Sequence, residues 1–206
     1  MCFDIKRIQG DKARVCKLGE TAVIQKLTEL GWDAFNANTS NPNYKGVDIM
    51  CINPFSLETK FIQVKASAED EPNFPTGLVY DPEAKIIGRK GEEQDAWKKK
   101  IVGSWVFVHI KQGCDGITYK FYILTKKELT CLIEHSNNWY WNNVGKTEKP
   151  DQPIGLPISW VTGEKNGKVK NLRGWRLYPG CTGIENPQDA WWKIGVPKKD
   201  EVSISH

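Results

Sequence analysis

Two apolar stretches separated by a short polar turn, Val47–Ile52 and Thr59–Ala66, constrain the fold of this chain more than any other feature. Both are rich in β-branched and aromatic residues, and the Asn53–Pro54 pair after the first stretch is typical of a turn. The pattern therefore predicts a β-hairpin. Centring the turn between Phe55 and Ser56 fixes a register, which decides the residues that face each other across the two strands.

This register brings polar side chains together inside apolar strands. Asp48 is predicted to lie opposite Gln63. Because side chains alternate along a strand, Gln63 and Lys65 share one face, while Val64 and Ala66 point to the other. A lysine in a strand built for a core is costly unless acidic groups or the ligands of an ion lie nearby.

The segment before the hairpin is predicted to be a helix. Apolar residues recur at helical spacing from about Asp11 to Leu30, and Gly31 ends the run. Glu20 precedes Val23 and Leu27 by three and seven positions, so its carboxylate lies on the apolar stripe. It either reaches solvent at the edge of that stripe or has a partner in the fold.

The order of a helix acid, a strand acid and Q-x-K on the next strand resembles the PD-(D/E)xK, restriction-endonuclease-like nuclease superfamily. The resemblance rests on Gly46-Val47-Asp48 and on Phe61-Ile-Gln-Val-Lys-Ala-Ser67, and it covers about Leu18 to Ser67. It implies an α/β fold, with a restriction-endonuclease-like core in which helices flank a mixed central β-sheet.

The same resemblance implies a role for each polar residue. Asp48 corresponds to the metal-binding aspartate, Lys65 to the catalytic lysine, and Glu20 to the acid often supplied by the first helix. Gln63 stands where the motif has a second acid, and the family includes active glutamine variants. The implied metal ligands are Asp48, Gln63 and Glu20, and the implied cofactor is Mg²⁺, with Mn²⁺ as a substitute.

The rest of the chain divides less clearly. We expect an exposed loop from Glu69 to Gly91, strands at Ser104–Ile110 and Ile117–Leu124, and a helix that ends near His135. Beyond it, tryptophans stand among glycine, proline and lysine without periodicity. We therefore expect a nuclease core over residues 1–136 and an irregular, Trp-rich C-terminal extension over residues 137–206 that packs on the core.

The charge balance gives only weak support for an anionic partner, because 29 basic residues oppose 25 acidic ones for a net charge of +4. DNA is the expected partner on the resemblance. Five basic residues are candidates for phosphate contacts: Lys45, Arg89, Lys90, Lys98 and Lys99. Cutting both strands of a duplex would make a homodimer natural.

No stretch has the length of apolar sequence that a membrane span needs, and the first residues lack the apolar region of a secretory signal. We expect no membrane partner and a cytoplasmic location. The six cysteines show no C-x-x-C spacing, so we expect reduced thiols. Cys131 and His135 could share a helix face, but no second pair completes a zinc site.

The expected function is metal-dependent endonuclease cleavage of DNA phosphodiester bonds, either restriction-like in defence or at junctions in repair. Two alternatives stay open. Gln63 fits a catalytically inactive nucleic-acid-binding module of the same fold, and the near-balanced charge with many tryptophans fits a protein-interaction domain.

Overall fold

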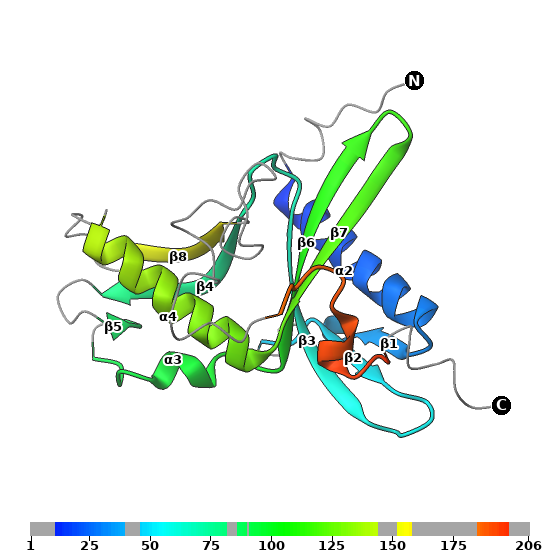
Figure 1. Ribbon diagram of the computed structural model, residues 1–206, viewed down its shortest axis with the longest axis horizontal. Helices are drawn as coiled ribbons and strands as arrows, with labels where there is room; N and C mark the ends of the chain where they lie inside the picture. Colours follow the sequence, from blue (N-terminus) through cyan, green and yellow to red (C-terminus); the bar gives the residue numbers. More distant parts are fainter. Residues whose placement is uncertain are drawn as a thin grey trace. The chain divides into compact units, whose positions relative to one another are not determined.

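The computed structural model describes residues 11–39, 46–81, 86–89, 91–143, 152–157 and 185–197 (Figure 1). The chain forms two compact units. The first comprises Met1–Asp70, Val102–Thr125 and Asn186–His206, and the second comprises Glu71–Ile101 and Lys126–Glu185. The fold is mixed α/β, as the sequence predicts.

A five-stranded mixed sheet forms the centre of the first unit, in the order β1-β2-β3-β6-β7. Its strands are β1 (Asp33–Asn36), β2 (Ile49–Ile52), β3 (Thr59–Ser67), β6 (Ser104–Gly113) and β7 (Gly116–Leu124). Neighbouring strands are antiparallel except β3 and β6, which are parallel. A parallel pair needs a long connection, and the chain that joins these two strands belongs mostly to the second unit.

The predicted hairpin register is confirmed. Ile49 pairs with Ile62 and Met50 with Phe61, and the next pair in this register would be Asp48 with Gln63. Asp48 lies just before β2, and its backbone N–H donates to the carbonyl oxygen of Ile62 at 2.9 Å. Asp48 and Gln63 therefore start next to each other, as the hairpin prediction requires.

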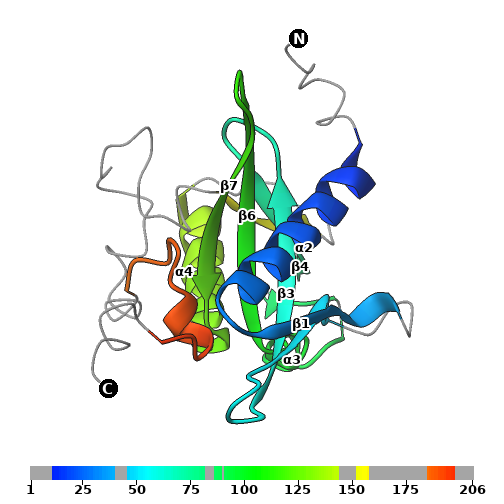
Figure 2. The ribbon, with the colours of Figure 1, turned by 90° about the vertical axis from the view of Figure 1, so that its right-hand side faces the viewer.

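The predicted first helix is α2 (Lys12–Glu29), capped by the Asp11 side chain, which accepts from the backbone N–H of Arg14. It packs across β3 and β6 (Figure 2). Gly19 permits this close approach, because a Cβ there would collide with the Cβ of Ala66. The helix thus covers the Val64 and Ala66 face of β3.

The core of the first unit lies on that same face of the sheet. Val23 and Leu27 of α2 pack with Ile62 of β3 and Val106 of β6. The 3-10 helix η4 (Trp191–Ile194) joins this cluster, with the Trp191 ring edge-on to Phe121 of β7 at 5.3 Å between centroids. Part of the predicted C-terminal extension therefore packs on the sheet.

The second unit contains a three-stranded sheet in the order β5-β4-β8. Its elements are β4 (Asn73–Asp81), β5 (Ile86–Ile87), β8 (Gln152–Pro157), the short helix α3 (Ala96–Lys99) and the helix α4 (Lys126–Asn143). The helix α4 runs well beyond the predicted end at His135. The predicted boundary between residues 136 and 137 falls inside it, and the division into a core and an extension stays a prediction.

The expectation of an exposed loop from Glu69 to Gly91 is wrong, because β4 and β5 occupy much of it. Inward positions of β4 carry Phe74, Leu78 and Tyr80, whereas Gly77 lies on the exposed face. Proline and glycine on the exposed positions of β4 had made an alternating strand look like a loop in the sequence.

The expectation of reduced thiols is wrong at Cys131, which is disulfide-bonded. Cys16, Cys51 and Cys114 are free. A bonded Cys131 cannot pair with His135 in a metal site. Within the described part of the chain, no helix is long and apolar enough to cross a membrane.

Candidate active site

The candidate site lies where β2 begins beside β3. Asp48 is the residue directly before β2. The backbone N–H of Val64 donates to Oδ2 of Asp48 at 2.7 Å. The Asp48 side chain thus accepts from a β3 backbone N–H just beyond the end of the β2–β3 backbone pairing. This bond fixes the half-buried carboxylate against β3 and leaves Oδ1 able to accept a further ligand.

Gln63 and Lys65 are half-buried on the opposite face of β3 from Val64. The Lys65 ammonium lies over the ring of Trp105, 5.3 Å from its centroid. Trp105 pairs with Gln63 in the register and is only 2% exposed. An aromatic face attracts an ammonium without carrying a compensating negative charge.

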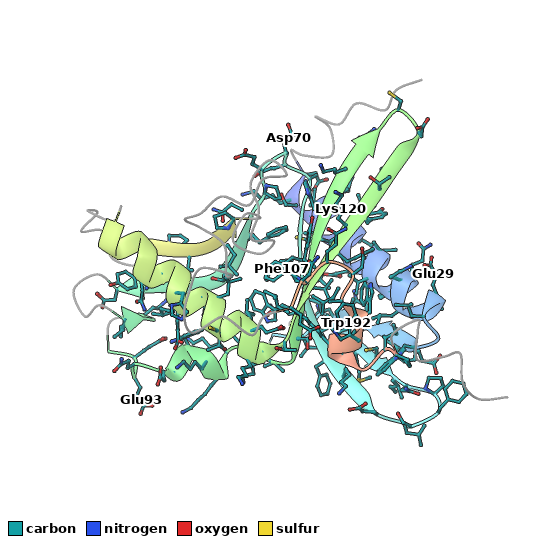
Figure 3. All side chains as sticks on the ribbon, viewed as in Figure 1. Glu29, Asp70, Glu93, Phe107, Lys120 and Trp192 are labelled. Carbon is teal, nitrogen blue, oxygen red and sulfur yellow. The ribbon has the colours of Figure 1, made fainter. Side chains whose placement is uncertain are left out.

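The position of Trp105 is itself fixed by packing. Its ring lies 5.9 Å from that of Phe107, centroid to centroid, and Phe107 lies near the middle of β6 (Figure 3). Nothing in the sequence spacing links Trp105 to Lys65. Their contact depends on the parallel pairing of β3 with β6, which is set by the tertiary fold.

Glu20 is held by a residue that sequence reasoning missed. The side-chain amide of Asn36 in β1 donates to Oε2 of Glu20 at 2.8 Å, and its oxygen accepts from the backbone N–H of Asn38. The amide orientation is thus fixed from both ends.

Burial raises the pKa of Glu20 above its ordinary value, and the charge of Asp48 raises it further. The Asn36 hydrogen bond and the charges of Lys17 and Lys65 act in the opposite direction without cancelling this effect. Two carboxyl groups that repel each other in a half-buried place are favourable for a cation.

Glu20 and the two β3 residues start from opposite faces of β3. The helix α2 covers the Val64 face, whereas Gln63 and Lys65 belong to the other. The carboxyl of Glu20 nevertheless lies within electrostatic reach of both Asp48 and Lys65. Asp48, at the edge where β2 joins β3, is the residue common to both sides.

Cys16 stands one helical turn before Glu20 and is not one of the predicted site residues. Burial raises the pKa of its thiol, as does the charge of Glu20, while Lys65 lowers it. The thiol thus lies within reach of the charges of Glu20, Lys65 and Asp48.

The donors available for a metal are the carboxylates of Asp48 and Glu20 and the amide oxygen of Gln63. In the described part of the chain, no group of three or more His, Cys, Asp or Glu side chains is arranged to hold a metal. The donor set is made of hard oxygen atoms, which suit Mg²⁺ or Mn²⁺ rather than softer ions.

The basic residues predicted to contact phosphate have varied surroundings. Lys45 and Lys90 lie outside the described residues. Arg89 is exposed. Lys98 is paired with Asp95 and with Glu134 at 3.0 and 2.6 Å, whereas Lys99 is 82% exposed and stands 4.0 Å from Glu93. Of the described three, Lys98 is therefore the least available to a phosphate.

Comparison with family models, curated proteins and solved structures gives no match for this chain.

Proposed function

We propose that this protein is a Mg²⁺-dependent endonuclease that hydrolyses DNA phosphodiester bonds, on a core related to that of restriction endonucleases. The observation that carries the proposal is the placement of Asp48. Its carboxylate is fixed by the Val64 N–H at the edge of β3, and its charge acts on Glu20. Lys65 lies on the same strand, β3, two positions after Gln63.

Asp48 and the Gln63 carbonyl would hold the cation, with Glu20 acting from the other side of the strand through water. Bound there, Mg²⁺ would polarise the scissile phosphate and lower the pKa of a water ligand. The cation would also relieve the repulsion that raises the pKa of Glu20. Gln63 contributes an oxygen but no charge, so Asp48, Glu20 and the phosphate supply the negative charge.

Lys65 acts on the phosphate and on the attacking water. Its ammonium, held over the Trp105 ring, can orient the water or offset charge that develops on the phosphate oxygens. The Trp105 contact positions Lys65 without adding a negative charge beside it. A second water protonates the leaving oxygen in this scheme.

A non-catalytic nucleic-acid-binding module is the rival that a specific observation favours. Gln63 lacks the charge of a second acid, and a weaker cation site would support binding without turnover. Binding without cleavage would leave the Lys65 contact with Trp105 as a device for holding a phosphate.

The two functions separate in a cleavage assay with single-stranded and duplex DNA, in Mg²⁺, in Mn²⁺ and in EDTA. We expect the wild-type chain to cleave in either cation and not in EDTA. Lys65→Ala should cut at least about a hundredfold more slowly, the scale of losing one charge-stabilising group. DNA binding without metal-dependent cleavage by the wild-type chain would favour the binding module.

A further inference from the structure

Two exposed phenylalanines lie in a row across the first three strands of the sheet. Phe35 of β1 pairs with Met50 of β2, and Met50 pairs with Phe61 of β3. Directly paired residues share a face, so the three side chains form one apolar row. Phe35 is 50% exposed and Phe61 is 39% exposed.

The row lies on the face of the sheet that carries the catalytic candidates. Phe61 precedes Gln63 by two positions and Lys65 by four, so all three side chains leave β3 on the same side. At a rise of about 3.3 Å per residue, Phe61 and Lys65 are about 13 Å apart along the strand. A few nucleotides of one strand span this distance.

We propose that Phe35 and Phe61 form a stacking platform for unpaired bases, which makes single-stranded DNA, or a single-stranded segment beside a duplex, the preferred substrate. This inference rests on the proposed function for the role of Lys65 and goes beyond it in naming the substrate class. A base whose phosphate lies at Lys65 would have its neighbours over the row.

Unpaired bases suit this surface better than a duplex does. Bases in a duplex are already stacked on each other, and their faces are not available to a protein ring, whereas unpaired bases present free faces that stack on aromatic side chains irrespective of sequence. The row is apolar, and the Lys65 ammonium beyond it provides the charge that a backbone phosphate needs.

The test compares Phe35→Leu, Phe61→Leu and the double variant with Phe55→Leu. Phe55 is a matched control, because it is 94% exposed in the turn of the same hairpin but lies outside the row. Leucine keeps an apolar side chain and removes the aromatic face. Binding of a fluorescent single-stranded oligonucleotide and of its duplex is measured by anisotropy in EDTA, where no cleavage occurs.

We expect each row variant to weaken single-strand binding by at least about fivefold, the lower end of the loss per stacked base, with little change for the duplex. Phe55→Leu should bind like wild type. Equal affinities of the row variants and the control would overturn the platform while leaving cleavage, and with it the proposed function, intact.

A wild-type chain that binds single strands through the row but never cleaves would contradict the proposed function and not the platform. A second copy of the chain is the other occupant to test. Sedimentation that shows a wild-type dimer, and a monomer for Phe35→Asp, would assign the row to self-association and overturn the platform.

Discussion

At the residue scale, Asp48 has a structural task and a proposed chemical one, and two substitutions separate them. Asp48→Asn keeps an oxygen that accepts from the Val64 N–H and removes the charge. Asp48→Ala leaves that part-buried N–H without its acceptor. We expect Asp48→Ala to lose about 1 to 2 kcal/mol of unfolding free energy and Asp48→Asn much less, while both lose cleavage. Urea unfolding measures the first and the DNA assay the second; cleavage retained by Asp48→Asn would remove the residue from the chemistry.

Glu20 gives a prediction in the pH dependence of stability. Its pKa is raised above 4.5 in the fold by burial and by Asp48. Protonated Glu20 therefore stabilises the fold below about pH 4.5. This contribution is lost as the pH rises through the pKa of Glu20 in the folded protein. Glu20→Gln cannot ionise and keeps an oxygen for Asn36, so it should melt about 1 to 4 °C above wild type at pH 7.5 in EDTA and close to wild type at pH 4.

Glu29 is the matched control for this measurement, because it lies on the same helix and its pKa is shifted in the opposite direction. Its pKa is lowered by hydrogen bonds from Lys26 and Gln25, so its stability contribution is present above about pH 4.5 and lost as the pH falls through the folded value. Glu29→Gln should melt at or below the wild-type temperature at pH 7.5. Equal behaviour of the two variants would contradict the raised pKa of Glu20.

Gln63 tests whether an amide serves as a cation ligand. Gln63→Glu adds a charge with almost no change of shape, so we expect half-maximal cleavage at a lower Mg²⁺ concentration. The cleavage rate can move in either direction, because the new carboxylate also attracts Lys65 and opposes the phosphate. Gln63→Ala should lower both the affinity for the metal and the rate. Identical metal titrations for all three chains would exclude a ligand role.

At the scale of elements, the site depends on how closely α2 approaches β3. Gly19→Ala gains about 1 kcal/mol of helix propensity, but its Cβ collides with Ala66, and overpacking costs about 1 to 3 kcal/mol. We expect a net loss of stability and slower cleavage as Glu20 moves. The double variant Gly19→Ala, Ala66→Gly removes the collision and should recover much of both in urea unfolding and cleavage. If Gly19→Ala alone is as stable and as active as wild type, the contact between α2 and β3 is looser than the structure indicates.

Sequence patterns predicted the elements that depend on local periodicity. The register of β2 and β3 followed from the turn and the alternation of side chains, and α2 followed from its apolar spacing and its cap. β4 was missed because its outward positions hold proline and glycine. The Asn36 contact with Glu20 and the Trp105 contact with Lys65 join distant segments, so no local pattern could reveal them.

At the scale of the whole molecule, every described residue of the candidate site belongs to the first of the two units. Glu20, Asp48, Gln63 and Lys65 come from its first segment, and Trp105 comes from its second. Arg89, Lys98 and Lys99 belong to the second unit. Substitutions of Asp48, Gln63 and Lys65 therefore test the chemistry in one unit, and substitutions of the three basic residues test DNA affinity in the other.

The central claim is that Asp48 anchors a divalent cation beside Lys65, and calorimetric titration of the full chain with Mn²⁺ tests it most directly. We predict that wild type binds Mn²⁺ in a titration that fits a specific site, that Asp48→Asn loses this binding, and that Lys65→Ala keeps it, because the ammonium is no ligand. Binding by Asp48→Asn with the wild-type affinity, or no binding by a folded wild-type chain, would contradict the account.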